Sequence, residues 1–67
     1  MLNRNELKGV MAKFGDTQET LAEFLNISIT SVTNKMLGRS EFKPSEITQI
    51  VARYDLDNEQ IRTIFLN

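Results

Sequence analysis

The chain has no cysteine and no histidine among its 67 residues, and only one proline and three glycines. Without cysteine it can form neither a disulfide bond nor a thiolate zinc site, and without histidine it lacks the other common ligand of transition metals. We therefore expect no metal and no cofactor. The sequence also shows no linker and no internal repeat, so we expect one domain over residues 1–67.

Long hydrophobic runs are also absent. No apolar segment approaches the roughly 20 residues that a membrane-spanning helix requires. The first residues, MLNRNELK, lack the apolar centre of a signal peptide. No nucleophile has an adjacent candidate base other than scattered carboxylates. We expect a cytoplasmic protein that does not associate with membranes and is not an enzyme.

The charge is small but unevenly distributed. The net charge is −1, whereas residues 24–43 carry three basic residues against one acidic residue. A near-neutral chain is a weak candidate for binding nucleic acid, but this local excess of positive charge would suit a phosphate backbone. By charge alone, a solvated surface of mixed sign is an equally good interpretation.

Hydrophobic spacing predicts helices throughout and no strand. A first helix, roughly 4–14, ends at Gly15, a residue suited to the left-handed position that follows a helix. A second helix, about 18–25, begins after Thr17 as its cap and ends where Asn26 must turn the chain. The apolar faces of these two helices consist of Leu7, Val10, Met11 and Phe14, and of Leu21, Ala22 and Leu25.

The next segment, SITSVTNK, contains mediocre helix formers. Val32 and Met36 are nevertheless one helical turn apart, and Ser28 can cap a helix over about 29–36. This spacing predicts a third helix with a buried apolar side and an unusually polar outer side.

Two further helices complete the pattern after a loop over 38–42. Pro44 is favoured in a first helical turn and opens the fourth helix, where Glu46 complements the helix dipole. Asp57, with Gln60 three residues later, is a capping-box-like start of a short fifth helix. The apolar residues of these helices are Ile47, Ile50, Val51 and Tyr54, then Ile61, Ile64 and Phe65.

The segment TQETLAEFLNISITSVTNKMLG resembles the helix-turn-helix of the phage Cro and repressor-like (lambda-repressor-like) family of transcription regulators. The matching positions are Thr17, Gln18, Leu21, Ala22, Asn26, Val32 and Gly38. The five-helix pattern extends the resemblance to nearly the whole chain, and SEFKPSEI with the closing IFL is similar to small Cro-like regulators of Gram-positive prophages. The resemblance implies an all-α, compact five-helix DNA-binding domain with a supporting helix about 18–25 and a recognition helix about 29–36.

One departure from the family pattern concerns Lys35, which stands where the family usually has a buried aliphatic residue. We expect Met36 to fill that space in the core and Lys35 to keep its charge in water.

The resemblance also implies a binding site. In the family, the start and exposed face of the recognition helix read base edges in the major groove, where short polar side chains offer donors and acceptors. The expected base-reading residues are Ile29, Thr30, Ser31, Thr33 and Asn34. The expected contacts to the DNA backbone are Thr17, Gln18, Lys35, Arg39, Ser40 and Lys43.

The expected function is that of a sequence-specific transcription regulator, a Cro-type phage or prophage repressor that occupies a double-stranded DNA operator. A homodimer is expected at least on DNA, with apolar contact from Ile64, Phe65 or Leu66 in the last helix. A different class stays open: an antirepressor or antitoxin-like module that keeps the same frame but binds another phage regulator. The residues do not separate Cro from repressor roles.

Overall fold

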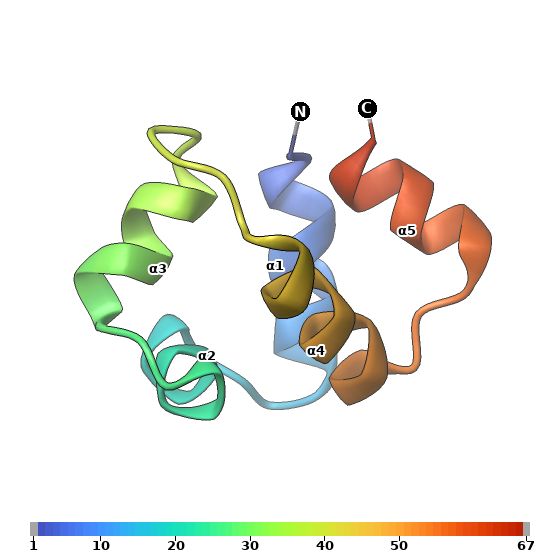
Figure 1. The fold of residues 1–67 in the computed structure, drawn as a ribbon. Coiled ribbons are helices and arrows are strands. Elements are labelled where there is room, and N and C mark those ends of the chain that lie inside the picture. Colours follow the sequence, from blue (N-terminus) through green and yellow to red (C-terminus); the bar gives the residue numbers. More distant parts are fainter. Residues whose placement is uncertain (1, 67) are drawn as a thin grey trace.

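The computed structural model of the protein describes residues 2–66. These residues form five α-helices and no strand (Figure 1): α1 (Arg4–Lys13), α2 (Gln18–Leu25), α3 (Ile29–Met36), α4 (Pro44–Tyr54) and α5 (Asn58–Phe65). The all-α class and the five predicted helices are therefore confirmed. The first helix ends at Lys13, one residue earlier than predicted, and Phe14 is its cap.

Short polar side chains start most of the helices. The predicted caps Thr17, Ser28 and Asp57 each accept a hydrogen bond from the backbone N–H three residues later. Asn3 does the same for α1, where its Oδ1 accepts from the N–H of Glu6 at 3.2 Å. These bonds satisfy N–H groups that have no partner inside a helix, which explains why the chain begins its helices at these residues.

A residue in the left-handed conformation follows each of the first four helices, α1 to α4. Asn26 has φ 59° at the end of α2, as the sequence predicts, and Gly15 and Gly38 have φ 75° and 81°. Asp55 ends α4 with φ 50°, which the sequence analysis did not anticipate. Asn and Asp tolerate this conformation better than most residues that carry a Cβ atom, so these turns are sharp without requiring glycine.

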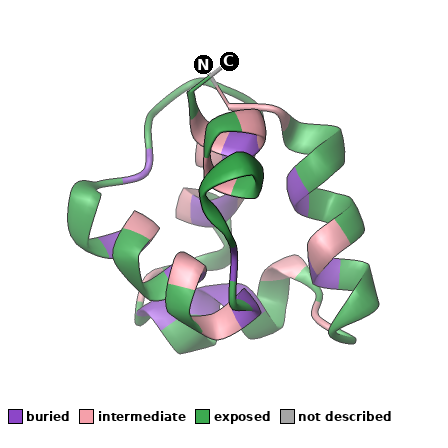
Figure 2. Cartoon of the chain, turned by 90° about the vertical axis from the view of Figure 1, so that its right-hand side faces the viewer, coloured by how far each residue is buried: buried purple, intermediate pink, exposed green. Residues whose placement is uncertain are grey.

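A single core lies between the helices. Buried residues recur along each helix among exposed ones (Figure 2), and they form one cluster. Its members are Leu7, Met11, Leu21, Ala22, Leu25, Val32, Met36, Phe42, Ile50, Tyr54, Leu56 and Ile64. Met11 and Met36 are core residues, as predicted. Phe14, by contrast, is 52% exposed and packs edge-to-face on Tyr54 with 5.2 Å between ring centroids.

Two helix pairs organise the packing: α2 with α3, and α1 with α5. The Asn3 N–H donates to the Ile64 carbonyl at 2.7 Å, which holds the start of α1 beside the end of α5 (Figure 1). In the same view α3 and α5 lie on opposite sides of the molecule.

Candidate functional site

The candidate site is built on α2, the turn after it, and α3. Ala22 is 2% exposed and Val32 is fully buried between these helices. The small side chain of Ala22 permits close approach of two helix backbones. The Ile27 N–H donates to the Ala22 carbonyl at 3.0 Å, closing the turn at Asn26. The orientation of α3 is thus fixed by core packing and by a short, hydrogen-bonded turn.

None of the five predicted base-reading residues of α3 is buried in the core. Ile29 is 49% exposed and Thr30 is exposed, whereas Ser31, Thr33 and Asn34 are half-buried. The opposite face, with Val32 and Met36, is in the core. The helix is therefore amphipathic in the expected sense, with its short polar residues outside the core.

Some polar side chains of α3 form hydrogen bonds within the protein and others do not. Ser31 Oγ accepts a hydrogen bond from Ser28 Oγ at 3.0 Å, within the capping turn. The Asn34 side chain forms no hydrogen bond with any other residue in the range 2–66. Its amide therefore keeps both a donor and an acceptor for an external partner.

Thr33 and Gln18 are joined across the two helices. Thr33 Oγ1 donates to Gln18 Oε1 at 2.7 Å, and both side chains are half-buried. Thr33, which was predicted to read a base, is thus hydrogen-bonded to Gln18, which was predicted to contact the DNA backbone. Both residues are among the predicted DNA contacts, but the bond between them was not predicted, because no local pattern reports a contact between residues 15 apart.

The start of α2 is held by a reciprocal cap. The Thr17 hydroxyl accepts from the Thr20 N–H at 3.2 Å, and the Thr17 N–H donates to Thr20 Oγ1 at 2.8 Å. This capping box has Thr where Glu or Gln is usual. The Thr17 hydroxyl oxygen therefore already accepts a hydrogen bond from the protein backbone, although Thr17 is exposed to solvent.

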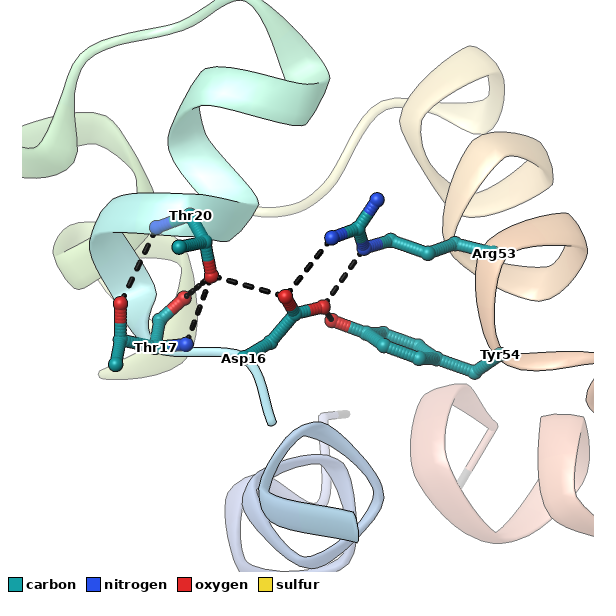
Figure 3. A network of polar contacts seen from close by, with 5 residues as sticks. All are labelled: Asp16, Thr17, Thr20, Arg53 and Tyr54. Atoms are coloured by element: carbon teal, nitrogen blue, oxygen red, sulfur yellow. Dashed lines mark hydrogen bonds and ion pairs between the residues drawn. The ribbon is translucent and has the colours of Figure 1, made fainter. Parts of the chain in front are cut away.

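Asp16 anchors the same end of α2 to α4 (Figure 3). Its carboxylate accepts from Arg53 Nε and Nη2 at 2.7 and 2.8 Å, from the Tyr54 hydroxyl at 2.6 Å and from the Thr20 hydroxyl at 3.0 Å. The Arg53 guanidinium also lies 4.5 Å from the centroid of the Phe24 ring. Four donor atoms from three residues therefore converge on one carboxylate.

This arrangement shifts the pKa values of Asp16 and Tyr54 in opposite directions. The hydrogen bonds from Arg53 lower the pKa of Asp16 well below its usual range; burial opposes this shift, and Tyr54 and Thr20 reinforce it. Burial, followed by the hydrogen bond to Asp16, raises the pKa of Tyr54 above its usual value. The cluster therefore carries a fixed ion pair, and the charge of Arg53 is neutralised.

The position of the Lys35 charge differs from the sequence prediction. Lys35 Nζ lies 2.6 Å from Glu46 Oε1, and the two side chains are only 11% and 8% exposed. The expectation that this charge stays in water is wrong, because the first turn of α4 places a carboxylate against it. Glu46 also accepts from the Lys43 N–H at 2.8 Å, so it caps α4 as well.

Glu46 stays ionised in this ion pair. Burial alone would raise the pKa of Glu46, but the hydrogen bonds from Lys35 and from the Lys43 backbone outweigh it and lower that pKa. Sequence reasoning assigned Glu46 only to the helix dipole. The one signal was a lysine in a position that favours an aliphatic residue, and it does not say which carboxylate pairs with that lysine; Glu46 lies eleven residues away.

The remaining predicted backbone contacts lie after α3. Arg39, Ser40 and Lys43 are all exposed, in the segment that crosses from α3 to α4 (Figure 1). Arg39 and Lys43 form no ion pair with another residue in the range 2–66. Because Lys35 is paired with Glu46, these two side chains provide the free positive charge that directly follows α3.

The fold brings one further basic residue close to the end of α3. Arg4, at the start of α1, shares a shallow depression with Leu37 and Gly38 at the end of α3. It is exposed. No sequence signal could have placed it there, because the proximity depends on how α1 packs against the rest of the fold.

Residues 2–66 contain no group of three or more Asp or Glu side chains placed to hold a metal ion. None of the helices in that range is both long and apolar enough to cross a membrane. Comparisons of the chain with known protein families, with curated proteins and with solved structures found no match.

Proposed function

We propose that α2, the turn at Asn26 and α3 form a helix-turn-helix, and that the protein is a sequence-specific DNA-binding transcription regulator. Its action is operator occupancy, as in the Cro-type phage and prophage repressors that the sequence resembles. The observation that carries the proposal is the outer face of α3. Its Asn34 amide has no partner within the described chain, while its inner face is fixed in the core. A rigid helix with free polar groups suits reading of base edges in a major groove.

Several features around α3 support this proposal. Gln18 lies at the start of α2, where backbone N–H groups have no partner within the helix and favour a phosphate oxygen. Arg39 and Lys43 follow α3 as exposed cations. In this proposal Asn34 and Thr30 face base edges, whereas Gln18 and Arg39 contact phosphates on either side of the reading helix.

The proposal includes a homodimer on DNA. Each chain offers one reading helix, α3 (Ile29–Met36), whereas the half-sites of an operator lie about 34 Å apart along B-DNA, so one chain reads one half-site. The expected dimer contact through Ile64 needs correction, because Ile64 is 1% exposed and belongs to the chain's own core. Leu66 is 69% exposed, and it remains the best apolar candidate together with the half-buried Phe65.

A second candidate function is a protein-interaction module that binds another regulator. Two observations favour it: the ion pairs at Glu46 and Asp16 remove Lys35 and Arg53 from the free positive charge, and several large apolar side chains are exposed. Those side chains are Phe14, Phe24, Ile29, Leu37 and Leu66. Weak electrostatic attraction to phosphates is the main physical argument against DNA as the partner.

In vitro selection tests the proposal. The purified protein is used to select duplexes from a random-sequence library, and the affinity for an enriched duplex (the selected duplex) is compared with that for a duplex of the same composition in scrambled order (the shuffled duplex). A DNA-binding regulator should enrich a pseudo-palindromic sequence and bind the selected duplex at least about 10³-fold more tightly. A library without enrichment after repeated rounds contradicts the proposal and favours the protein-interaction module.

A further inference from the structure

The bond between Thr33 and Gln18 changes what each side chain can do. Thr33 Oγ1 donates its only proton to Gln18 Oε1 at 2.7 Å. A threonine hydroxyl has one donor, so Thr33 has none left for a base edge. Sequence reasoning places Thr33 among the base-reading residues, but its hydroxyl is directed toward α2.

The same bond sets the direction of the Gln18 amide. A carboxamide is planar, and its oxygen and nitrogen lie on opposite branches. With Oε1 held by Thr33, Nε2 faces away from that contact, and it donates no hydrogen bond to any residue in the range 2–66. Two N–H donors are thus presented in a fixed orientation beside the start of α2.

Fixing this orientation matters because a free glutamine side chain loses considerable rotamer entropy when it binds. The hydrogen bond to Thr33 restricts the rotamers of Gln18 in the unbound protein, so less entropy is lost on binding. The two residues also lie on different helices, α2 and α3, so the bond sets the position of the α2 donor relative to the outer face of α3.

We infer that Thr33 is a positioning residue for Gln18: it directs the Gln18 Nε2 donors toward a phosphate oxygen of DNA and does not itself read a base. This inference rests on the proposed function. It assigns the sequence-reading role on α3 to the other residues of that face, with Asn34 foremost, and it couples the phosphate contact of α2 to the helix in the groove.

Four variants test the inference on the selected and shuffled duplexes. Thr33→Val keeps the branched shape but removes the hydroxyl, and it should weaken binding to both duplexes by the same factor, about five- to tenfold per bound chain. Thr33→Ser keeps the hydroxyl and should bind like the parent. Gln18→Ala should weaken both duplexes, and adding Thr33→Val to Gln18→Ala should cause no further loss.

Gln18→Glu provides a second route if Thr33→Val folds poorly. A glutamate keeps an oxygen that accepts from Thr33, so the melting temperature should stay near that of the parent. It removes both N–H donors and adds a negative charge near a phosphate, so affinity for both duplexes should fall by more than in Gln18→Ala.

The outcomes separate this inference from the proposed function. A loss confined to the selected duplex in Thr33→Val, or an additional loss when Thr33→Val is combined with Gln18→Ala, would show that Thr33 contacts a base and overturn the inference alone. Failure of the parent protein to enrich any duplex would overturn both.

Discussion

Asp16 and Arg53, 37 residues apart in the sequence, form a bidentate ion pair with N–O distances of 2.7 and 2.8 Å. The pair joins the segment before α2 to the end of α4, and Tyr54 donates to the same carboxylate. Because Asp16 directly precedes the cap Thr17, the pair also fixes where α2 begins. The position of the proposed helix-turn-helix in the fold thus depends on a contact outside it.

Replacing Asp16 with asparagine should destabilise the fold. Asp16→Asn keeps the size of the side chain but removes the charge that Arg53 and Tyr54 engage, and we expect the free energy of unfolding to fall by about 2–3 kcal/mol. Urea unfolding at neutral pH measures this change. Asp55→Asn is the matched control: Asp55 is exposed with φ 50°, a conformation that asparagine tolerates, and its stability should match the parent's.

The free energy of unfolding should depend on pH through the ionisation of Asp16. The folded-state pKa of Asp16 is depressed, so its contribution is fully present above the unfolded pKa of about 3.9 and is lost as the pH falls through the folded value. The parent should therefore lose stability more steeply than Asp16→Asn below about pH 4. Parallel curves for the two proteins in acid would refute the role of Asp16.

Lys35 and Glu46 should show strong coupling. Lys35→Met leaves a buried carboxylate without its main partner, and the expected loss of stability is about 2–3 kcal/mol. Adding Glu46→Gln removes the unpaired charge while an amide oxygen can still accept from the Lys43 N–H. The double variant should recover most of the loss in urea unfolding. A double variant no more stable than Lys35→Met would show that the ion pair is not the relevant interaction.

The contrast between predicted and unpredicted features has a physical cause. Thr17, Ser28, Asn26 and Asp57 occupy their predicted local roles because caps and turns depend on residues three or four positions apart. The pairs of Asp16, Glu46 and Gln18 depend on which helix packs beside which, and hydrophobic periodicity reports only which side of a helix is buried.

The same limit applies to individual residues of the candidate site. Exposure of Arg39 and Lys43 follows from their place in a polar loop. Burial of the Lys35 charge does not follow from α3 alone, because the carboxylate that accepts it belongs to α4. Helix faces were therefore predictable, whereas the partners of polar groups were not.

Ala22 tests the close packing of α2 and α3. Ala22→Leu adds volume at a site that is 2% exposed, and we expect overpacking to reduce stability by about 1–3 kcal/mol. Thermal unfolding measures the loss, and affinity for the selected duplex should fall as α3 shifts. Ala52→Leu, at an exposed position of α4, is the control and should melt like the parent. Equal melting of Ala22→Leu and the parent would argue against close packing at this site.

Arg39 tests the proposed phosphate contact. Arg39→Ala should weaken the selected and shuffled duplexes alike and reduce the slope of log affinity against log salt by about 0.9 per bound chain. Arg62→Ala removes the same charge from α5, on the far side of the molecule from α3 (Figure 1), and should leave the slope close to the parent's. An unchanged slope in Arg39→Ala would remove this residue from the interface.

The most direct test of sequence-specific reading by α3 is the affinity of Asn34→Ala for the selected and shuffled duplexes. A bidentate contact to adenine predicts a loss of about 1–3 kcal/mol on the selected duplex, little loss on the shuffled one, and relaxed preference at a single base pair of each half-site. Asn58→Ala, an exposed Asn-to-Ala change at the start of α5, should bind both duplexes like the parent. Equal losses for Asn34→Ala on both duplexes, or no loss on either, would contradict base reading by this residue.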